Sequence, residues 1–397
     1  MKTPLEGVTV LDLSHALAGP YCSMMLADYG ADVIKIEPPT GDIARLWGVP
    51  ASGTETAYFI GLHRNKRGVV LDMRLPRGRE LFLEMVGKAD VVVENYRVGT
   101  LKKLGIDHEA ARRVNPGIIY ASISGFGQDG PYRDRAAMDL ILQAESGMIS
   151  VTGEAGGRGA RCGVSIADLT AGMNAVMGIL MALRVKERTG QGQAIDISMM
   201  EGQMSLLGTL IGNYIANGKM PVPMGTAYAS LLPYQTFRTA SRDVGIAVGS
   251  EKLWKTFCPL IGHPELTHHP KFRTNRERTQ NFAELIDILQ KTFLTKTYEE
   301  WEALFLKEGI PVGAVNNIGQ VVEHPQVAAR GSLVDIDHPS AGTVRVVGVP
   351  VRLSATPGSV RTPSPTLGQH TEQVLQQMLG KSEAEIADLR KAGVLGQ

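Results

Sequence analysis

The 397-residue sequence has few cysteines and almost no net charge. Its three cysteines, Cys22, Cys162 and Cys258, are far apart and odd in number, which argues against a disulfide framework and against a zinc site. Lysine plus arginine (41) nearly balances aspartate plus glutamate (40), so no overall field favours nucleic acid or an anionic membrane. An anionic ligand would therefore have to be held by local groups.

Long apolar segments are also scarce. The most apolar stretch, residues 172–185, is shorter than the roughly 20 residues that a helix needs to span a bilayer. Near the start, Pro4 and Glu6 stand where a signal peptide would need an unbroken apolar run. We therefore expect a soluble, cytoplasmic protein without a membrane partner.

Several motifs of nucleotide binding and hydrolysis are missing. The sequence contains no GxGxxG fingerprint, no P-loop and no Gly-x-Ser-x-Gly elbow. His108-Glu109 begins like the metalloprotease motif HExxH, but Arg112 replaces the second histidine. The pair His268-His269 lacks further ligands at metal spacing, so we expect a solvated loop there and no metal site.

What the sequence does contain is a repeated alternation of strands and helices. Short apolar strands are predicted at residues 8–13, 31–37, 68–71, 89–94, 117–122 and 193–198, with helices between most of them. This order predicts an α/β fold with a mainly parallel, doubly wound sheet. The length suits two domains, and composition breaks near residues 218–226 and 311–324 mark candidate boundaries.

Two features of this sheet could serve an anionic ligand. Gly19-Pro20 follows the first strand and opens a helix, where free N–H groups can receive a phosphate; a plain structural turn is the alternative. Two basic clusters lie in predicted loops and are either solvated or part of a phosphate-rich cofactor site. They comprise Arg64, Lys66 and Arg67 in the first and Arg97, Lys102 and Lys103 in the second.

Asp168 is the residue most suited to carry chemistry. It lies in the segment VSIADLTAG (residues 164–172), just before the longest helical pattern, residues 173–186. Aspartate at such a place commonly caps a helix, because its oxygen accepts hydrogen bonds from free N–H groups. The alternative is a nucleophilic carboxylate that attacks an activated acyl group. Local sequence leaves both interpretations open.

Motifs spread over the whole chain resemble the class III CoA-transferases, the family of formyl-CoA:oxalate and carnitine CoA-transferases. The matching segments follow the family's order. They are AGP (18–20), LADYGADVIKIEPPTGD (26–42), NKRGVVLDM (65–73), ADVVVENY (89–96), ADLTAGM (167–173), TGQGQ (189–193), PYQTF (233–237) and LGQHT (367–371).

This resemblance implies a domain plan and a set of site residues. It implies a Rossmann-like large domain from residues 1–217 and 325–397, a linker at 218–225, a smaller α+β domain at 226–324, and an interlocked homodimer. It assigns Asp168 as the nucleophile. The implied contacts with coenzyme A are Leu17, Leu71, Met73, Asn95, Tyr96 and Lys103.

The resemblance also implies a reaction. CoA would pass from a donor such as succinyl-CoA to a carboxylic or dicarboxylic acid through a covalent aspartyl intermediate, with CoA thioesters as substrates and no permanently bound cofactor. Pro38 and Pro39 replace arginines of formyl-CoA transferase, so its phosphate contacts do not transfer. The short segment 225–230 replaces that enzyme's long glycine-rich loop, which argues against oxalate as the acceptor.

Two other functions remain open at this stage. An α-methylacyl-CoA racemase shares the fold but carries its base in a Gly-His-Asp run, where this chain has Ala137-Met138-Asp139. The second is a non-catalytic CoA-binding protein in which Asp168 is only a helix cap.

Overall fold

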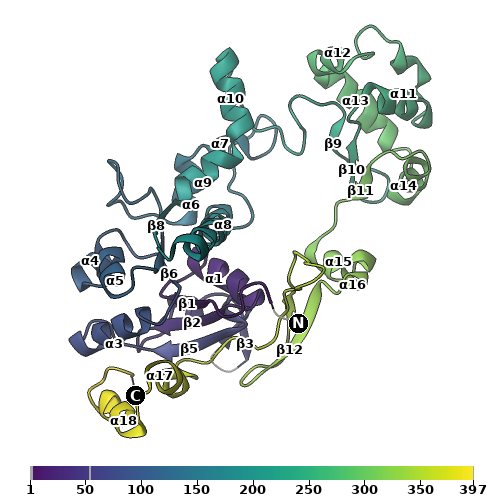
Figure 1. Cartoon of the computed structure of the whole chain (residues 1–397). Helices are drawn as coiled ribbons and strands as arrows, with labels where there is room; N and C mark the ends of the chain where they lie inside the picture. The colour runs from purple at the N-terminus through teal and green to yellow at the C-terminus, as the bar shows by residue number, and fades with distance from the viewer. Residues whose placement is uncertain (1–2, 53–54, 397) are drawn as a thin grey trace. The chain divides into compact units, whose positions relative to one another are not determined.

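The computed structural model describes residues 3–52 and 55–396, and the chain divides into two compact units (Figure 1). Unit 1 comprises residues 1–148, 162–218 and 325–397, and unit 2 comprises residues 149–161 and 219–324. Unit 1 therefore contains both ends of the chain. The segment 149–161 clusters with unit 2, whereas the expected boundaries placed it in the large domain.

Unit 1 is built on a six-stranded parallel sheet with the strand order β5-β2-β1-β6-β7-β8. The strands are β1 (Thr9–Asp12), β2 (Asp32–Glu37), β5 (Lys66–Val70), β6 (Val91–Glu94), β7 (Ile119–Ser124) and β8 (Ala194–Ser198). Val91, Val92 and Val93 are all fully buried, as expected for a central strand covered on both faces. The mainly parallel α/β architecture predicted from the sequence is confirmed.

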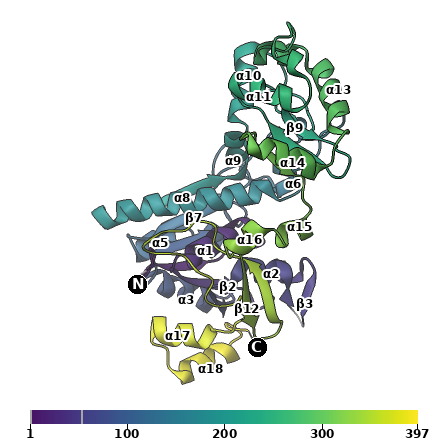
Figure 2. The ribbon, with the colours of Figure 1, turned by 90° about the vertical axis from the view of Figure 1, so that its right-hand side faces the viewer.

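Helices supply the core on both faces of this sheet. One face packs against α3 (Pro76–Val86), α5 (His108–Val114), α17 (Thr371–Leu379) and α18 (Glu383–Lys391). The other face packs against α1 (Ala18–Asp28), α6 (Asp139–Glu145) and α8 (Ile166–Thr189). Figure 2 shows α8 on one side of the sheet and α17 and α18 on the opposite side.

The C-terminal segment is hydrogen-bonded to the edge strand β5. The Gly68 N–H donates to His370 Nδ1 (3.1 Å), and the His370 N–H donates back to the Gly68 carbonyl (2.9 Å). The Val70 N–H donates to Thr371 Oγ1 at 3.1 Å. These bonds attach residues more than 300 positions apart, so unit 1 needs both chain ends.

Helices α1 and α8 approach each other closely at Gly172. A Cβ atom at this position would lie 2.7 Å from the Ala18 carbonyl oxygen and 3.1 Å from the Tyr21 ring. Only glycine allows the two backbones to come this near. Further along α8, the small buried residues Ala175 and Ala182 continue the packing against the core.

Helix α8 begins earlier than the sequence pattern suggested. It starts at Ile166 rather than Met173, and its N-cap is Ser165, whose side chain makes no capping bond. The capping oxygen comes from another helix, because the Ala167 N–H donates to Asp139 Oδ1 at 2.9 Å. The start of α8 is therefore set by a tertiary contact, which local sequence does not encode.

The full helix is also longer than the expected apolar stretch. With 24 residues, α8 is the helix among the described residues that is long and apolar enough to cross a membrane, a test that core helices of soluble proteins also pass. Its residues Ala171, Ala175 and Ile179 are fully buried in the core of unit 1.

The remaining elements of unit 1 are mostly short. They are the 3-10 helix η1 (Ile43–Leu46), β3 (Pro50–Ser52), β4 (Glu55–Thr56), α2 (Ala57–His63), α4 (Thr100–Leu104), α9 (Met199–Leu206), α10 (Gly208–Asn217), α16 (Pro325–Ala329) and the hairpin of β12 (Leu333–His338) and β13 (Gly342–Val347). Helix α7 (Met148–Val151) crosses from one unit into the other.

Unit 2 combines a three-stranded antiparallel sheet with helices around an aromatic core. The sheet order is β11-β10-β9, and buried Trp254, Phe257 and Trp301 belong to its core. The elements are β9 (Tyr234–Phe237), β10 (Val244–Ala247), α11 (Glu251–Leu260), η2 (Pro264–Thr267), α12 (Asn275–Gln280), α13 (Phe282–Phe293), α14 (Tyr298–Lys307), β11 (Val312–Ala314) and α15 (Ile318–Val322).

Replacing Gly172 tests the close approach of α1 and α8. We expect Gly172→Ala to lower the free energy of unfolding by about 1–3 kcal/mol, because the new methyl group meets backbone atoms that cannot move aside. Gly178→Ala is the control on the same helix, since its Cβ would meet only the Ile195 side chain at 3.0 Å. Equal effects in denaturant unfolding would contradict the proposed constraint.

Candidate active site

The order of the strands places a crevice beside β1. The chain runs from β1 to β2 on one side, whereas β6 pairs with β1 on the other side. Ligands of doubly wound sheets bind outside the carboxyl ends of the strands at such a reversal. Here the two loops that follow β1 and β6 join: the His15 N–H donates to Asn95 Oδ1 (2.7 Å), and Asn95 Nδ2 donates to the His15 carbonyl (2.8 Å).

The loop after β1 is held in an uncommon conformation. Ala16 has a φ of 62°, in the left-handed region that residues with a Cβ seldom adopt. Its N–H donates to Asp42 Oδ1 at 3.2 Å, and the neighbouring His15 ring meets the Tyr96 ring edge-on with centroids 4.6 Å apart. These contacts fix the turn that leads into α1.

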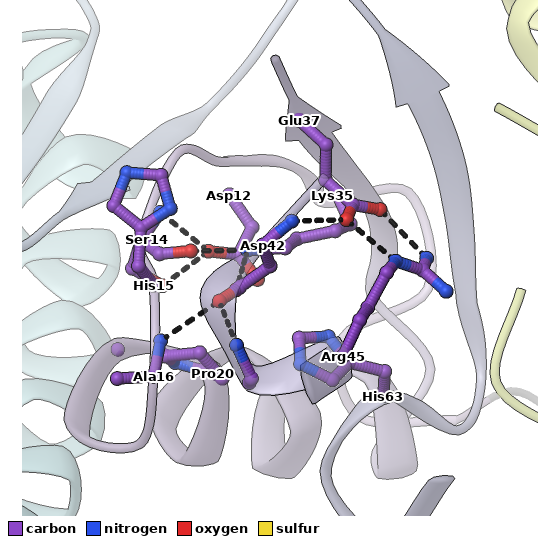
Figure 3. A network of polar contacts seen from close by, with 12 residues as sticks. Asp12, Ser14, His15, Ala16, Pro20, Lys35, Glu37, Asp42, Arg45 and His63 are labelled. Atoms are coloured by element: carbon purple, nitrogen blue, oxygen red, sulfur yellow. Dashed lines mark hydrogen bonds and ion pairs between the residues drawn. The ribbon is translucent and has the colours of Figure 1, made fainter. Parts of the chain in front are cut away.

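A buried ionic network lies beneath this loop (Figure 3). Lys35 Nζ is 2.8 Å from Asp42 Oδ2 and also donates to the Ser14 carbonyl, and both charged side chains are fully buried. Asp42 in addition accepts the Ala44 N–H at 2.9 Å. Because each charge has partners, the cost of burying it is offset by charge-assisted hydrogen bonds.

Asp12 and Lys66 form a second buried pair in the same region. Asp12 Oδ2 lies 3.1 Å from Lys66 Nζ and accepts the Ser23 hydroxyl at 2.6 Å. Burial alone would raise the pKa of Asp12, but the charges of Lys66 and Lys35 and the hydrogen bonds from Ser14 and Ser23 together hold that pKa well below its usual range. Asp12 is therefore ionised, whereas burial lowers the pKa of Lys66 to about 8.

These pairs correct one expectation about the basic clusters. Lys66 is buried with Asp12, Arg64 is buried with Asp28 (2.7 Å), and Arg67 pairs with Asp32. The residues of the first cluster therefore form ion pairs within unit 1 and are not free to bind a phosphate.

Asp168 lies opposite the start of α1. It is the third residue of α8, and the backbone N–H of Ala18, the first residue of α1, forms a hydrogen bond that lowers its pKa. Burial, followed by the charge of Asp139, more than offsets this bond and raises the pKa of Asp168 to about 7. The helix start expected to receive a phosphate or form a plain turn therefore faces the chain's own carboxylate.

The capping interpretation of Asp168 is wrong. The N-cap of α8 is Ser165, and the carboxylate that accepts a hydrogen bond from the α8 start belongs to Asp139. The Asp168 carboxylate is instead poorly solvated and accepts a hydrogen bond from the Ala18 N–H of α1. A carboxylate whose pKa is raised in this way is typical of functional sites.

Tyr58 also belongs to this neighbourhood. Burial raises the pKa of Tyr58 to about 12, with further contributions from the charges of Asp168 and Asp42. Its ring meets Trp47 edge-on at 5.9 Å. Sequence reasoning missed Tyr58, Asp42 and Asp139, because only the folded chain brings Tyr58 and Asp139 near Asp168, and Asp42 near Tyr58.

The residues expected to contact CoA fall into three groups. Leu17, Asn95 and Tyr96 all lie in the two loops that meet beside β1. Leu71 and Met73 follow β5, and their side chains are 1% and 7% exposed in the core, so any contact would have to use their backbone. The last of the set, Lys103, is exposed on α4.

Glu94 is a second carboxyl group with a raised pKa. Burial raises it to about 7, although the Ser122 side chain and the Tyr96 N–H (2.8 Å) donate to it. It lines a cavity of about 410 Å³ together with Arg97 and Lys102 of the second basic cluster. Among the described residues, no group of three or more His, Cys, Asp or Glu is arranged to hold a metal ion.

Comparison with known proteins agrees with the motifs and the fold. The sequence model of a family described as CoA-transferase family III matches residues 5–371. The chain belongs to this family. As a family III CoA-transferase it is an enzyme that uses CoA thioesters and carboxylates as substrates.

Its relatives span nearly the full chain. Human succinyl-CoA:glutarate CoA-transferase is 38% identical over 99% of this chain and 90% of its own, and succinate–glutarate CoA-transferase of Agrobacterium fabrum is 36% identical over 95% and 96%. The crystal structure of a CAIB/BAIF family protein from Brucella suis matches with a TM-score of 0.84 at 36% identity, covering 95% of this chain and 100% of that one.

The raised pKa of Asp168 predicts a pH-dependent cost in stability. The folded state holds this proton up to about pH 7, whereas the unfolded chain releases it near its ordinary value of 3.8, so stability is lost as pH rises between these values. Between pH 5 and pH 8 we expect the wild type to lose about 3 kcal/mol more unfolding free energy than Asp168→Asn.

Denaturant unfolding at both pH values provides the measurement. Asp107→Asn is the matched control, because Asp107 caps α5 through the Ala110 N–H and its charge acts on Tyr120. The assignment would be contradicted if Asp168→Asn and Asp107→Asn changed stability equally at both pH values.

Proposed function

We propose that this enzyme transfers CoA from succinyl-CoA to a dicarboxylic acid such as glutarate, through a covalent intermediate on Asp168. The observation that carries the proposal is the Asp168 carboxylate itself: it accepts a hydrogen bond from the Ala18 N–H at the start of α1, has a pKa raised to about 7 and does not cap its own helix. Such a desolvated carboxylate is a stronger nucleophile than one in water.

The transfer proceeds by exchange of acyl bonds. An Asp168 oxygen attacks the thioester carbonyl carbon, the C–S bond breaks, and CoA thiolate leaves behind a succinyl–aspartyl anhydride. The thiolate then attacks the aspartyl carbonyl carbon, which releases succinate and forms an aspartyl–CoA thioester. The acceptor carboxylate reverses these two steps, and Asp168 is regenerated as a carboxylate.

The start of α1 suits the charge that develops during these steps. Each tetrahedral intermediate places negative charge on an oxygen beside the aspartyl or acyl carbon. The Ala18 N–H already faces this carboxyl group, and the positive end of the helix dipole adds to its effect. Thioester bond energy is conserved at every exchange, so positioning and oxyanion stabilisation are the enzyme's main tasks.

CoA is proposed to bind across the crevice beside β1. Leu17, Asn95 and Tyr96 lie there, and Leu71 and Met73 would contribute backbone after the end of β5, which lies two strands from β1. Lys103, the one cation of the expected set, is exposed on α4. The names of the relatives support the substrates: the human and Agrobacterium fabrum proteins are named for succinyl-CoA or succinate and for glutarate.

A homodimer with interlocked subunits is also part of the proposal. Helix α8 leaves a row of large apolar side chains exposed at helical spacing, which is unusual for a free surface. The row comprises Met173, Met177, Leu180, Met181 and Val185, exposed by 42–65%. A second copy of the chain is the partner that would bury it. We also place the enzyme in the cytoplasm, as a soluble protein.

Hydroxylamine trapping tests the covalent intermediate. Anhydrides and thioesters react with hydroxylamine, whereas an ionised carboxylate resists it. During incubation with succinyl-CoA we expect hydroxylamine to convert Asp168 to its hydroxamate and to inactivate the enzyme, with peptide mass analysis placing the change within residues 164–173. Asp168→Ala should remain folded and bind CoA but lose turnover by several powers of ten.

Two controls show whether inactivation depends on acylation of Asp168. The same treatment without acyl-CoA should leave the enzyme active, and Asp107→Asn should be inactivated like the wild type. A modified peptide elsewhere, or a folded Asp168→Ala variant with near-normal turnover, would refute the mechanism. A racemase or a simple CoA carrier forms no such adduct, and rapid α-deuterium uptake by a chiral 2-methylacyl-CoA would favour the racemase.

Subunit exchange tests the interlocked dimer. Two differently tagged preparations are mixed under native conditions and sampled over hours, after sizing has established a dimer across a wide dilution range. Interlocked chains cannot separate without unfolding, so we expect almost no mixed dimers. Complete exchange within minutes, or a stable monomer on dilution, would disprove the arrangement.

A further inference from the structure

Helix α6 holds the start of α8 through two side chains one turn apart. Asp139 accepts the Ala167 N–H at Oδ1 (2.9 Å) and the Gln143 amide at Oδ2 (2.7 Å). Gln143 is fully buried, and its Oε1 accepts the Cys162 N–H at 2.8 Å. Together these bonds fix the chain on both sides of Ser165, where α8 has no capping bond from its own N-cap side chain.

The residue after Ala167 is Asp168. We propose that Asp139 is a positioning residue for CoA transfer, which fixes the first turn of α8 and places a negative charge beside Asp168 that is relieved when Asp168 becomes acylated. This inference rests on the proposed role of Asp168 as the nucleophile.

The charge of Asp139 matters because acylation changes the charge of its neighbour. As a free carboxylate, Asp168 carries a negative charge in a poorly solvated place close to a second carboxylate. As an anhydride or a thioester it is neutral: the charge lies on the CoA thiolate at the anhydride stage and on the released succinate at the thioester stage. The repulsion therefore destabilises the reactant carboxylate more than the acyl-enzyme, which favours attack.

Among the described residues, Asp139 is the main like charge that acts on Asp168. From α6 Asp168 faces Asp139, from α2 it faces the Tyr58 phenol, and α1 presents the Ala18 N–H. Against the next turn of α8, α9 presents Gly202, close to Thr170. After burial, the charge of Asp139 is the larger of the remaining influences on the pKa of Asp168.

The test removes the charge while keeping a capping oxygen. Asparagine caps helices about as well as aspartate, so Asp139→Asn retains an acceptor for the Ala167 N–H. Gln143→Ala is the matched variant, because it breaks the same Asp139–Gln143 hydrogen bond and leaves the charge in place. Asp139→Ser, an uncharged residue that also caps helices, replaces Asp139→Asn if that variant does not fold.

The readouts separate charge from structure. In the wild type we expect kcat/KM for succinyl-CoA to rise with pH and level off above about pH 7, as Asp168 ionises. Asp139→Asn should shift this rise to lower pH by about one unit and slow acylation above it roughly three- to tenfold, with KM for succinyl-CoA unchanged. Gln143→Ala should leave the midpoint of the rise where it is in the wild type.

Each outcome has one meaning. An unchanged pH midpoint and acylation rate in Asp139→Asn overturns the proposed role of Asp139. Equal shifts in Asp139→Asn and Gln143→Ala also overturn it, because the effect would then be structural. If hydroxylamine fails to mark Asp168 even in the wild type, the proposed nucleophile is wrong, and that failure is distinct from the other two.

Discussion

The close contact between α1 and α8 is the constraint on which the candidate site depends. Gly172 lets the two helix backbones approach, and one turn earlier this brings Asp168 to the N–H of Ala18. A helix start normally presents free N–H groups to solvent or to a ligand. Here part of that capacity is directed at the chain's own carboxylate, so the reacting group and its stabilising dipole are assembled by a single packing contact.

Both helix starts in this contact are held by carboxylates from elsewhere in unit 1. Asp42 fixes the left-handed Ala16 ahead of α1, and Asp139 fixes Ala167 at the start of α8. Asp42 is ionised through its pair with buried Lys35. The loop geometry is therefore stabilised by charges that already have partners. For Asp168, a backbone N–H is the one group among the described residues that offsets its burial and its like-charged neighbour.

The paired and the poorly compensated carboxylates differ in pKa, and we connect this difference with their roles. Asp12 and Asp42 have pKa values below their usual range because lysines and hydrogen bonds together outweigh the effect of burial, and both residues hold the loop after β1. Asp168 and Glu94 have pKa values raised to about 7 by burial. In the proposed mechanism the fold destabilises the negative charge of the Asp168 carboxylate. Acylation removes this charge, so the destabilisation favours attack on the thioester.

The sequence by itself determined the fold class and the family. Alternating strand and helix patterns, whose periodicity is local, predicted the parallel sheet, and motifs from residue 18 to residue 371 matched the family in order. Only the tertiary structure decided the rest. It showed that α8 begins at Ile166, that Asp139 and not Asp168 accepts a bond from its start, that Arg64 and Lys66 are buried in ion pairs, and that Leu71 and Met73 point into the core. Capping partners, ion pairs and burial depend on contacts between residues far apart in the chain, and such contacts leave no local pattern to be found.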